Sequence, residues 1–214
     1  MKIETYNLLP SFGTNTYLVW DEKSNEGIII DPAQKSKKLL QKIKDREIKI
    51  RYILNTHGHG DHIGGNYFFT RALVDVPIAI HTADAEMLIN PDKNLSTPMG
   101  FNIKSQPAQI LLTEDSNLNF GNNIIKILHT PGHTEGGISI LINNLLFSGD
   151  TLFKESIGRT DLPGGNLETL KNSIKNKIFK LPESTIVLPG HGPKTSIKKE
   201  KTDNPFVGLA AKLF

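Results

Sequence analysis

The chain has 214 residues, no cysteine and a formal net charge of +3. The absence of cysteine excludes disulfides, thiolate zinc sites, Fe–S clusters and a cysteine nucleophile, so any metal must be held by histidine and carboxylate side chains. The small net charge does not favour a nucleic acid partner, and no apolar run is long enough to span a membrane. The N-terminus lacks the features of a signal peptide. We therefore expect a cytoplasmic protein that folds as a single domain over residues 1–214.

Hydrophobic periodicity predicts alternating strands and helices along the first half of the chain. Two strands separated by charged turn residues suggest a hairpin, and an amphipathic helix follows. A short buried strand then runs directly into a histidine-rich loop. The predicted elements are strands at 15–20 and 27–31, a helix at 33–46, a strand at 51–55, a loop at 56–62, a helix at 63–72, a strand at 77–80 and a helix at 82–89.

The second half opens with a proline-rich segment, residues 90–108, which predicts a long loop. Such loops in compact domains are usually functional or mobile. Strand patterns then return, and Asn143-Asn144 predicts a tight turn between two of them. The remaining predicted elements are strands at 124–129, 138–142 and 145–148, a loop at 150–166, a helix at 167–179 and a strand at 185–188. The whole pattern is compatible with two β-sheets packed together and flanked by helices.

The strongest chemical signal is the segment THGHGDH at residues 56–62. Side chains two residues apart in an extended stretch point the same way, so His57 and His59 are able to share one ion. Asp61 and His62 are adjacent and point elsewhere, toward a second ion. The intervening glycines allow a tight loop. Neutral imidazole and carboxylate ligands suit Zn, Fe(II) and Mn(II).

Three further groups of the same kind each follow a predicted strand. They are His133 in HTPGHT, Asp150 in FSGDT and His191 in LPGHG. A four-coordinate site with an open position needs about three protein ligands. Seven groups therefore fit two ions about 3.5–4 Å apart better than one ion, particularly where a carboxylate bridges them.

These motifs resemble those of the metallo-β-lactamase-fold hydrolases, with the glyoxalase II-like branch as the nearest match. The segments GDTLF at 149–153, SIGRTDLPGG at 156–165 and LPGHGP at 188–193 are similar to those of its small single-domain bacterial members. The resemblance implies a four-layer αβ/βα sandwich of two mixed sheets flanked by helices, with a dinuclear site between the sheet edges. The chain ends soon after the last motif, so the C-terminal helical domain of larger glyoxalase II enzymes is not expected.

The resemblance also implies a ligand set. One metal is expected on His57, His59 and His133, the other on Asp61, His62 and His191, and Asp150 is expected to bridge them. We expect two divalent ions, zinc first, with iron or manganese as alternatives. β-Lactamases of this fold do not normally carry the bridging Asp, and many use a Cys for the second metal. Asp150 and the missing cysteine therefore disfavour antibiotic hydrolysis.

The predicted reaction is hydrolysis of a small thioester, S-D-lactoylglutathione or a related acyl-thiol. Two cations lower the pKa of a shared water, which supplies a metal-bridging hydroxide near neutral pH. Attack on the carbonyl then needs no serine or cysteine nucleophile, and the thiolate leaves without strong acid assistance. Asp61 is predicted both to bind the second metal and to accept a hydrogen bond from the attacking water.

Several residues near these motifs carry two interpretations each. Asp31 either orients the histidine loop or simply forms the turn before a proline. Arg159 either binds an anionic part of the substrate or pairs with Asp161 to fix its loop. His81 is expected to be structural or pocket-lining rather than metal-bound, and His129 is expected to be a buried, hydrogen-bonded residue rather than a ligand.

Two other functions use the same residues. A persulfide dioxygenase has a similar fold and a GRTD-like loop but one iron, which would here be held by His57, His133 and Asp150. His191 favours the hydrolase, because it gives the second metal a third ligand. A phosphodiesterase or nuclease is also compatible with two metals, although the sequence has no basic insertion or aromatic strip for nucleic acid.

Overall fold

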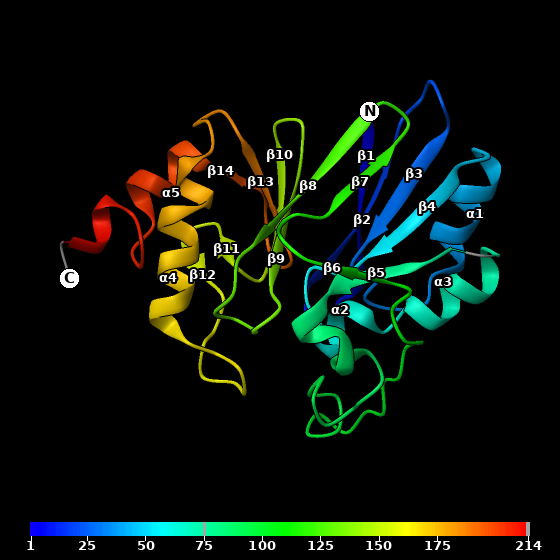
Figure 1. Ribbon diagram of the computed structural model, residues 1–214, viewed down its shortest axis with the longest axis horizontal. Coiled ribbons are helices and arrows are strands. Elements are labelled where there is room, and N and C mark those ends of the chain that lie inside the picture. The colour runs from blue at the N-terminus through cyan, green and yellow to red at the C-terminus, as the bar shows by residue number, and fades with distance from the viewer. Residues whose placement is uncertain (75, 213–214) are drawn as a thin grey trace.

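The computed structural model describes residues 1–74 and 76–212, which form two six-stranded sheets packed face to face (Figure 1). The first sheet has the strand order β1-β2-β3-β4-β5-β6. The β1–β2 and β2–β3 pairs are antiparallel, and the later pairs are parallel. Its strands are β1 (Lys2–Leu9), β2 (Thr14–Trp20), β3 (Glu26–Ile30), β4 (Lys49–Leu54), β5 (Ile78–His81) and β6 (Ile110–Leu112).

The second sheet is also mixed, with the order β14-β13-β10-β9-β8-β7. Strands β10 and β13 are parallel, and the other neighbours are antiparallel. Its strands are β7 (Asn117–Phe120), β8 (Asn123–His129), β9 (Ile138–Ile142), β10 (Leu145–Gly149), β13 (Ile186–Pro189) and β14 (Thr195–Ser196), and a separate short hairpin consists of β11 (Leu152–Phe153) and β12 (Ser156–Ile157).

Helices cover the outer faces of both sheets (Figure 1). Helices α1 and α3 lie beside the first sheet, and α4 and α5 lie beside the second. The predicted fold class, two mixed sheets flanked by helices in four layers, is therefore confirmed. The helices are α1 (Lys37–Asp45), α2 (Gly60–Ile63), α3 (Asn66–Ala72), α4 (Leu167–Asn176) and α5 (Ile197–Asp203), with 3-10 turns η1 (Thr82–Leu88), η2 (Ile178–Lys180) and η3 (Leu209–Lys212).

Strand β2 shows how the layers are built. Its residues Tyr17 and Val19 belong to the core between the sheets, while the alternating Leu18 and Trp20 pack toward the helices together with Leu39 of α1. A strand buried on both faces needs a nearly continuous apolar run, and NTYLVW provides one. The helices on the other side bury their own apolar faces against the second sheet through residues such as Leu170, Ile174 and Ile197.

All eight strands predicted from the sequence are present, and the strands that it missed share a position. Strands β1, β6, β7 and β14 are the outermost strands of the two sheets. An edge strand buries fewer side chains, so its hydrophobic alternation is weak. In β1, for example, no residue is fully buried. The hairpin β11–β12 lies inside the segment predicted as a loop.

The predicted helices differ from the observed ones mainly at their ends. The helix expected at 33–46 begins at Lys37, because the Ser36 hydroxyl accepts a hydrogen bond from the Leu39 N–H (3.1 Å) and caps it. The helix expected at 63–72 is split into α2 and α3. The segment 82–89 forms the 3-10 turn η1, and α4 ends before η2. Residues 90–108 contain neither helix nor strand, as predicted. None of the helices in the described ranges is long and apolar enough to cross a bilayer.

Candidate metal centre

Four loops meet at one end of the sandwich, each directly after a strand. They follow β4, β8, β10 and β13, and they carry all of the histidines and aspartates that the sequence motifs singled out. Within the described residues, the structure brings these side chains into three overlapping groups whose ligand atoms lie within 4.8 Å of one another. The groups are His57, His59 and His133; His57, His62 and Asp150; and Asp61, His62 and His191.

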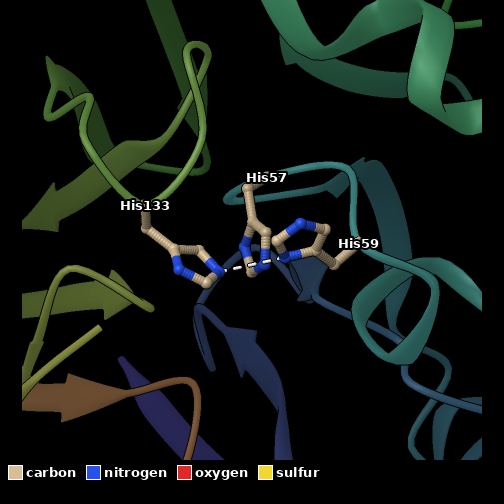
Figure 2. Close-up of side chains that lie close together, drawn as sticks. All are labelled: His57, His59 and His133. Atoms are coloured by element: carbon tan, nitrogen blue, oxygen red, sulfur yellow. Dashed lines mark hydrogen bonds between the residues drawn. The ribbon is translucent and has the colours of Figure 1, made fainter. Parts of the chain in front are cut away.

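The first group joins the two sheets. His57 and His59 come from the loop after β4, and His133 reaches them from the loop after β8 (Figure 2). The His59 Nδ1 and His133 Nε2 atoms are 3.0 Å apart. All three side chains are buried, so a cation bound here would be largely shielded from solvent.

The third group, Asp61, His62 and His191, lies beside the first, since the His57 and His62 ring centroids are 4.1 Å apart. Helix α2 begins at Gly60, earlier than predicted, and places Asp61 and His62 on its single turn. The Nε2 atoms of His62 and His191 are 3.1 Å apart. Asp61 Oδ2 lies 3.3 Å from His191 Nε2.

The Asp150 carboxylate, which belongs to the second group, faces ligands of the first and the third groups. Its Oδ2 atom lies 3.6 Å from His133 Nε2 and 3.4 Å from His191 Nε2, and its Oδ1 atom lies 3.4 Å from His62 Nε2. One carboxylate is thus within reach of ring nitrogens from both sets of ligands. This is the geometry that a bridging carboxylate requires.

Unpartnered atoms provide an independent test of whether cations fit the site. Within the described residues, four buried side-chain nitrogen or oxygen atoms have no hydrogen-bond partner, and three of them belong to this cluster. They are His57 Nε2, His59 Nε2 and Asp150 Oδ1. Buried polar atoms without partners are costly, and a divalent cation would satisfy imidazole and carboxylate donors of this kind. The residues present therefore fit divalent metal ions.

Three of the histidine rings are oriented by acceptors outside the cluster. His133 Nδ1 lies 2.8 Å from the Arg159 carbonyl oxygen, and His191 Nδ1 lies 2.9 Å from the Phe12 carbonyl oxygen. A carbonyl oxygen only accepts, so each Nδ1 must donate its proton, which leaves the Nε2 lone pair free for a metal. His62 Nδ1 has an equivalent partner in Asp31 Oδ2 at 3.0 Å.

The charges of the cluster are strongly coupled. Burial lowers the pKa of His62, but the neighbouring Asp61 and Asp150 carboxylates outweigh it and raise the pKa to about 9. Burial disfavours an ionised Asp150, yet the His62 and His191 rings reverse this and lower its pKa to about 2. Burial lowers the pKa of His57 well below the usual range, and the neighbouring histidines lower it further. Without cations the third group, which contains His62 and His191, therefore retains protons that a metal must displace.

Asp31 holds the histidine loop at two points. Its carboxylate accepts hydrogen bonds from the Thr56 N–H (2.7 Å) and the Thr56 hydroxyl (2.6 Å), in addition to the one from His62. Thr56 begins the loop, and His62 lies near its end. Of the two interpretations given for Asp31, these contacts correspond to the one in which it orients the loop.

Asp84 is a supporting residue that the sequence analysis missed. It lies in η1, and its buried carboxylate accepts hydrogen bonds from the Gly58 N–H (3.1 Å), the Thr134 hydroxyl (2.7 Å) and the Gly136 N–H (2.7 Å). Burial raises the pKa of Asp84 against the effect of these donors. Asp84 therefore connects the loop of His57 to the loop of His133. No local sequence signal identifies it, because its partners are far away along the chain.

The glycines in the histidine loop are required by close packing rather than by a positive φ. A Cβ atom at Gly58 would collide with the side chain of Met87. A Cβ at Gly60 would lie 3.1 Å from the Ser96 Cβ. Gly190, next to His191, is tighter still, because a side chain there would collide with the Asp150 carboxylate. These glycines therefore serve mainly to leave room for neighbouring side chains, in addition to the tight loop that the sequence predicts.

The other predicted residues lie farther from the cluster centre. Arg159 and Asp161 form an exposed two-point ion pair, with Arg159 Nε and Nη2 donating to the carboxylate at 2.8 and 2.7 Å. This hydrogen-bonded pair lowers the pKa of Asp161 to about 2. His81 and His129 stack on each other with ring centroids 4.1 Å apart, and His129 Nε2 lies 2.9 Å from the Glu135 carbonyl oxygen. His129 is half-buried rather than buried, because it lies near the end of an edge-adjacent strand.

The chain matches the family model of the metallo-beta-lactamase superfamily over residues 9–191. It belongs to the metallo-β-lactamase superfamily. A relative in Bacillus subtilis, a probable metallo-hydrolase named YqgX, is 39% identical and aligns over 89% of this chain and 90% of its own length. The hydroxyacylglutathione hydrolase GloC of Haemophilus influenzae is 34% identical over 92% of this chain and 94% of its own length. The chain is thus a superfamily hydrolase with a His/Asp cluster suited to divalent metal ions.

Solved structures of other superfamily members superpose on nearly the whole chain. The BLEG-1 B3 metallo-beta-lactamase has a TM-score of 0.91 at 38% identity and covers 96% of this chain and 99% of its own. TTHA1623 in a di-iron-bound form has a TM-score of 0.82 at 34% identity and covers 95% of this chain and 99% of its own. ETHE1 from Myxococcus xanthus has a TM-score of 0.82 at 27% identity and covers 97% of this chain and 84% of its own. These neighbours agree in fold and differ in the names that they carry.

Proposed function

We propose that this protein is a metal-dependent thioester hydrolase that acts on S-D-lactoylglutathione or a related acyl-thiol. The observation that carries the proposal is the position of the Asp150 carboxylate between two groups of ligand atoms. This arrangement suits two cations that share one water better than it suits one. The 34% identity to the Haemophilus hydroxyacylglutathione hydrolase supports the choice of substrate.

The seven side chains divide into two ligand sets. His57, His59 and His133 would hold one divalent ion, Asp61, His62 and His191 the other, and Asp150 would contact both. When bound, the ions supply Lewis acidity and make hydroxide available near neutral pH. We propose zinc as the ion, with iron as the first alternative because a similar structure is di-iron-bound.

Asp61 is the proposed positioning group for the water. Its Oδ2 atom already accepts a hydrogen bond from the Thr14 hydroxyl (3.1 Å), which fixes the carboxylate in the site. Its surroundings also keep it ionised, because the adjacent His62 and His191 rings lower its pKa in spite of burial. An ionised, oriented carboxylate is able to accept a hydrogen bond from a water molecule. A lone pair of the water oxygen then points at the carbonyl carbon of the substrate.

The first test is elemental analysis of protein purified without added metal, followed by assays with S-D-lactoyl-thiols. Close to two ions per chain together with thioester hydrolysis would support the proposal. Two ions without hydrolysis of any thioester would contradict it. Hydrolysis of a β-lactam antibiotic at a higher kcat/KM than any thioester would also contradict it and would follow the likeness to BLEG-1.

The Asp61→Asn variant tests the role of that carboxylate. We expect loss of most of kcat with partial metal loss, because the amide keeps an oxygen but loses the charge. The matched control is Asp203→Asn, which makes the same change on the exposed end of α5. Near-normal turnover of Asp61→Asn would refute its role.

The second candidate is a one-iron persulfide dioxygenase, and the similarity to ETHE1 is the observation that supports it. Its expected ligands, His57, His133 and Asp150, are all present in the cluster. One iron per chain with no other metal, and oxygen uptake in the presence of a persulfide, would favour this function over thioester hydrolysis.

A further inference from the structure

An apolar groove opens beside the metal centre. It has a volume of about 780 Å³, which lies in the range of small-molecule sites. Gly60 and Asp61 are among its lining residues, so the groove reaches one of the candidate metal ligands. Tyr67, Phe68, Arg71 and Ala72 of helix α3 (Asn66–Ala72) also line it.

The walls of the groove carry large apolar side chains that are not covered by the protein. Phe12, Tyr67, Met99 and Phe101 line it and are each between a third and a little over half exposed. An apolar patch of this kind in contact with solvent usually marks a binding site. Because the patch is concave and includes a candidate metal ligand, Asp61, the occupant that fits it is the substrate of the metal centre.

The outer wall is a fixed part of the fold. It comes from the loop 90–108, whose role the sequence left open. Asn94 ties the loop together, because its side-chain amide donates to the carbonyl oxygens of Met87 and Ile103, each at 2.9 Å. The Asn94 carbonyl oxygen accepts from the Gly60 N–H at 2.8 Å, which attaches the loop to the metal-binding segment.

The charges in the groove are mainly positive. Lys35 and Arg71 line it, and Asp61 is the one carboxylate among the lining residues that the structure describes. Tyr67 and Arg71 are four residues apart on α3, so they lie on the same face of the helix. No ion pair between described residues involves Lys35 or Arg71. The two cations are thus available for an anionic group on the ligand.

We propose that the groove binds the part of the thioester substrate remote from the reacting carbonyl, and that this part is an apolar chain ending in an anionic group. The apolar chain of the substrate lies along Phe12, Tyr67 and Phe101, and its anionic group binds Lys35 and Arg71. This inference rests on the proposed thioester hydrolysis and specifies its substrate class, namely acyl-thiols that are amphiphilic and anionic.

The first experiment measures binding without turnover. The probe is 8-(ethylthio)octanoate, a thioether that cannot be hydrolysed, titrated calorimetrically into the metal-loaded protein. We expect Lys35→Ala and Arg71→Ala each to weaken binding about tenfold, as loss of a charge-assisted hydrogen bond does. Phe101→Ala should weaken it severalfold. Lys44→Ala, the same change on an exposed lysine of α1 that does not line the groove, should leave it unchanged.

The second experiment measures turnover with two acetyl thioesters, one of 8-mercaptooctanoate and one of octanethiol. Arg71→Ala should raise KM for the anionic thioester about tenfold with kcat unchanged, and leave the neutral one unaffected. A parallel pair with the octanoyl chain on the acyl side shows which half of the substrate occupies the groove.

The outcomes separate the two proposals. Probe binding that is the same in wild type, Lys35→Ala, Arg71→Ala and Phe101→Ala would overturn the groove assignment, even if thioesters are hydrolysed. Variant-sensitive probe binding with no thioester turnover would retain the groove and reject the proposed function. A dimer in sedimentation that dissociates in Phe101→Ala would assign the groove to a second copy of the chain instead and overturn the inference.

Discussion

The two halves of the chain contribute to the metal centre in different ways. The half that forms β1–β6 supplies four of the seven candidate ligands from one continuous segment, His57 to His62. The half that forms β7–β14 supplies the other three from three separate loops. The apolar groove belongs entirely to the first half, since every residue that lines it precedes residue 104.

This difference separates two tasks. The first half supplies two of the three ligands in each proposed set, together with the surface on which a substrate rests. The second half completes both ligand sets and places Asp150 between them. Besides the contacts among the candidate ligands themselves, the Asp84 carboxylate and the stacked rings of His81 and His129 also join the halves around the site.

The largest effect is expected from Asp150, the carboxylate through which the second half reaches both ligand groups. Asp150→Asn should reduce kcat/KM on the order of 10³-fold and lower the metal content, because the amide loses the negative charge that faces both cations. Elemental analysis and steady-state kinetics measure this. The control is Asp115→Asn, an exposed position in the same half. Retention of two ions and normal turnover would show that the second half does not supply a bridging group.

A smaller effect is expected from the connection that Asp84 makes between the halves. Asp84→Asn keeps the size of the side chain but turns an amide N–H₂ toward N–H and hydroxyl donors. We expect metal affinity to fall about 10–100-fold, as it does when supporting partners of ligands are changed. Competition with a chelator measures the dissociation constant. Thr134→Val removes one of the three hydrogen bonds and should cost about 1 kcal/mol of unfolding free energy. An unchanged dissociation constant in Asp84→Asn would mean that the halves are positioned without it.

The smallest effect is expected from the His81–His129 stack and depends on pH. Burial, with a contribution from His129, lowers the pKa of His81 to about 4 in the folded protein. The unfolded chain therefore takes up this proton first, so the stability contributed by neutral His81 is lost as the pH falls from about 6.5 to about 4. We expect the loss of unfolding free energy to be on the order of 1 kcal/mol or less.

Comparison with His81→Asn isolates this contribution. Asparagine is able to cap η1 as His81 does, by accepting from the Ala83 N–H, but it does not titrate. Urea unfolding of both proteins at several pH values should show a difference in free energy that shrinks toward low pH. If the difference in unfolding free energy stays constant from pH 7 to pH 4, protonation of His81 does not affect the contact between the halves, and this prediction is wrong.

The sequence by itself determined the central strands and the identity of the seven clustered side chains. Strands such as β2 and β9 are buried in the sheet interior, so their sequences contain apolar runs such as YLVW and ILI. The four ligands of the first half are visible because they are adjacent in the chain. His133, Asp150 and His191 are visible because each follows a strong strand.

Only the tertiary structure decided the edge strands, Asp84 and the groove. The strands β1, β6, β7 and β14 owe their conformation to hydrogen bonds with a neighbour rather than to their own burial. Asp84 bonds to residues 26, 50 and 52 positions away, so no local pattern marks it. The groove combines Phe12, Lys35, Arg71 and Phe101 from four separate segments. The proximity of these residues depends on how helices, strands and loops pack against one another. Sequence periodicity describes only the faces of a single helix or strand, so it does not predict that proximity.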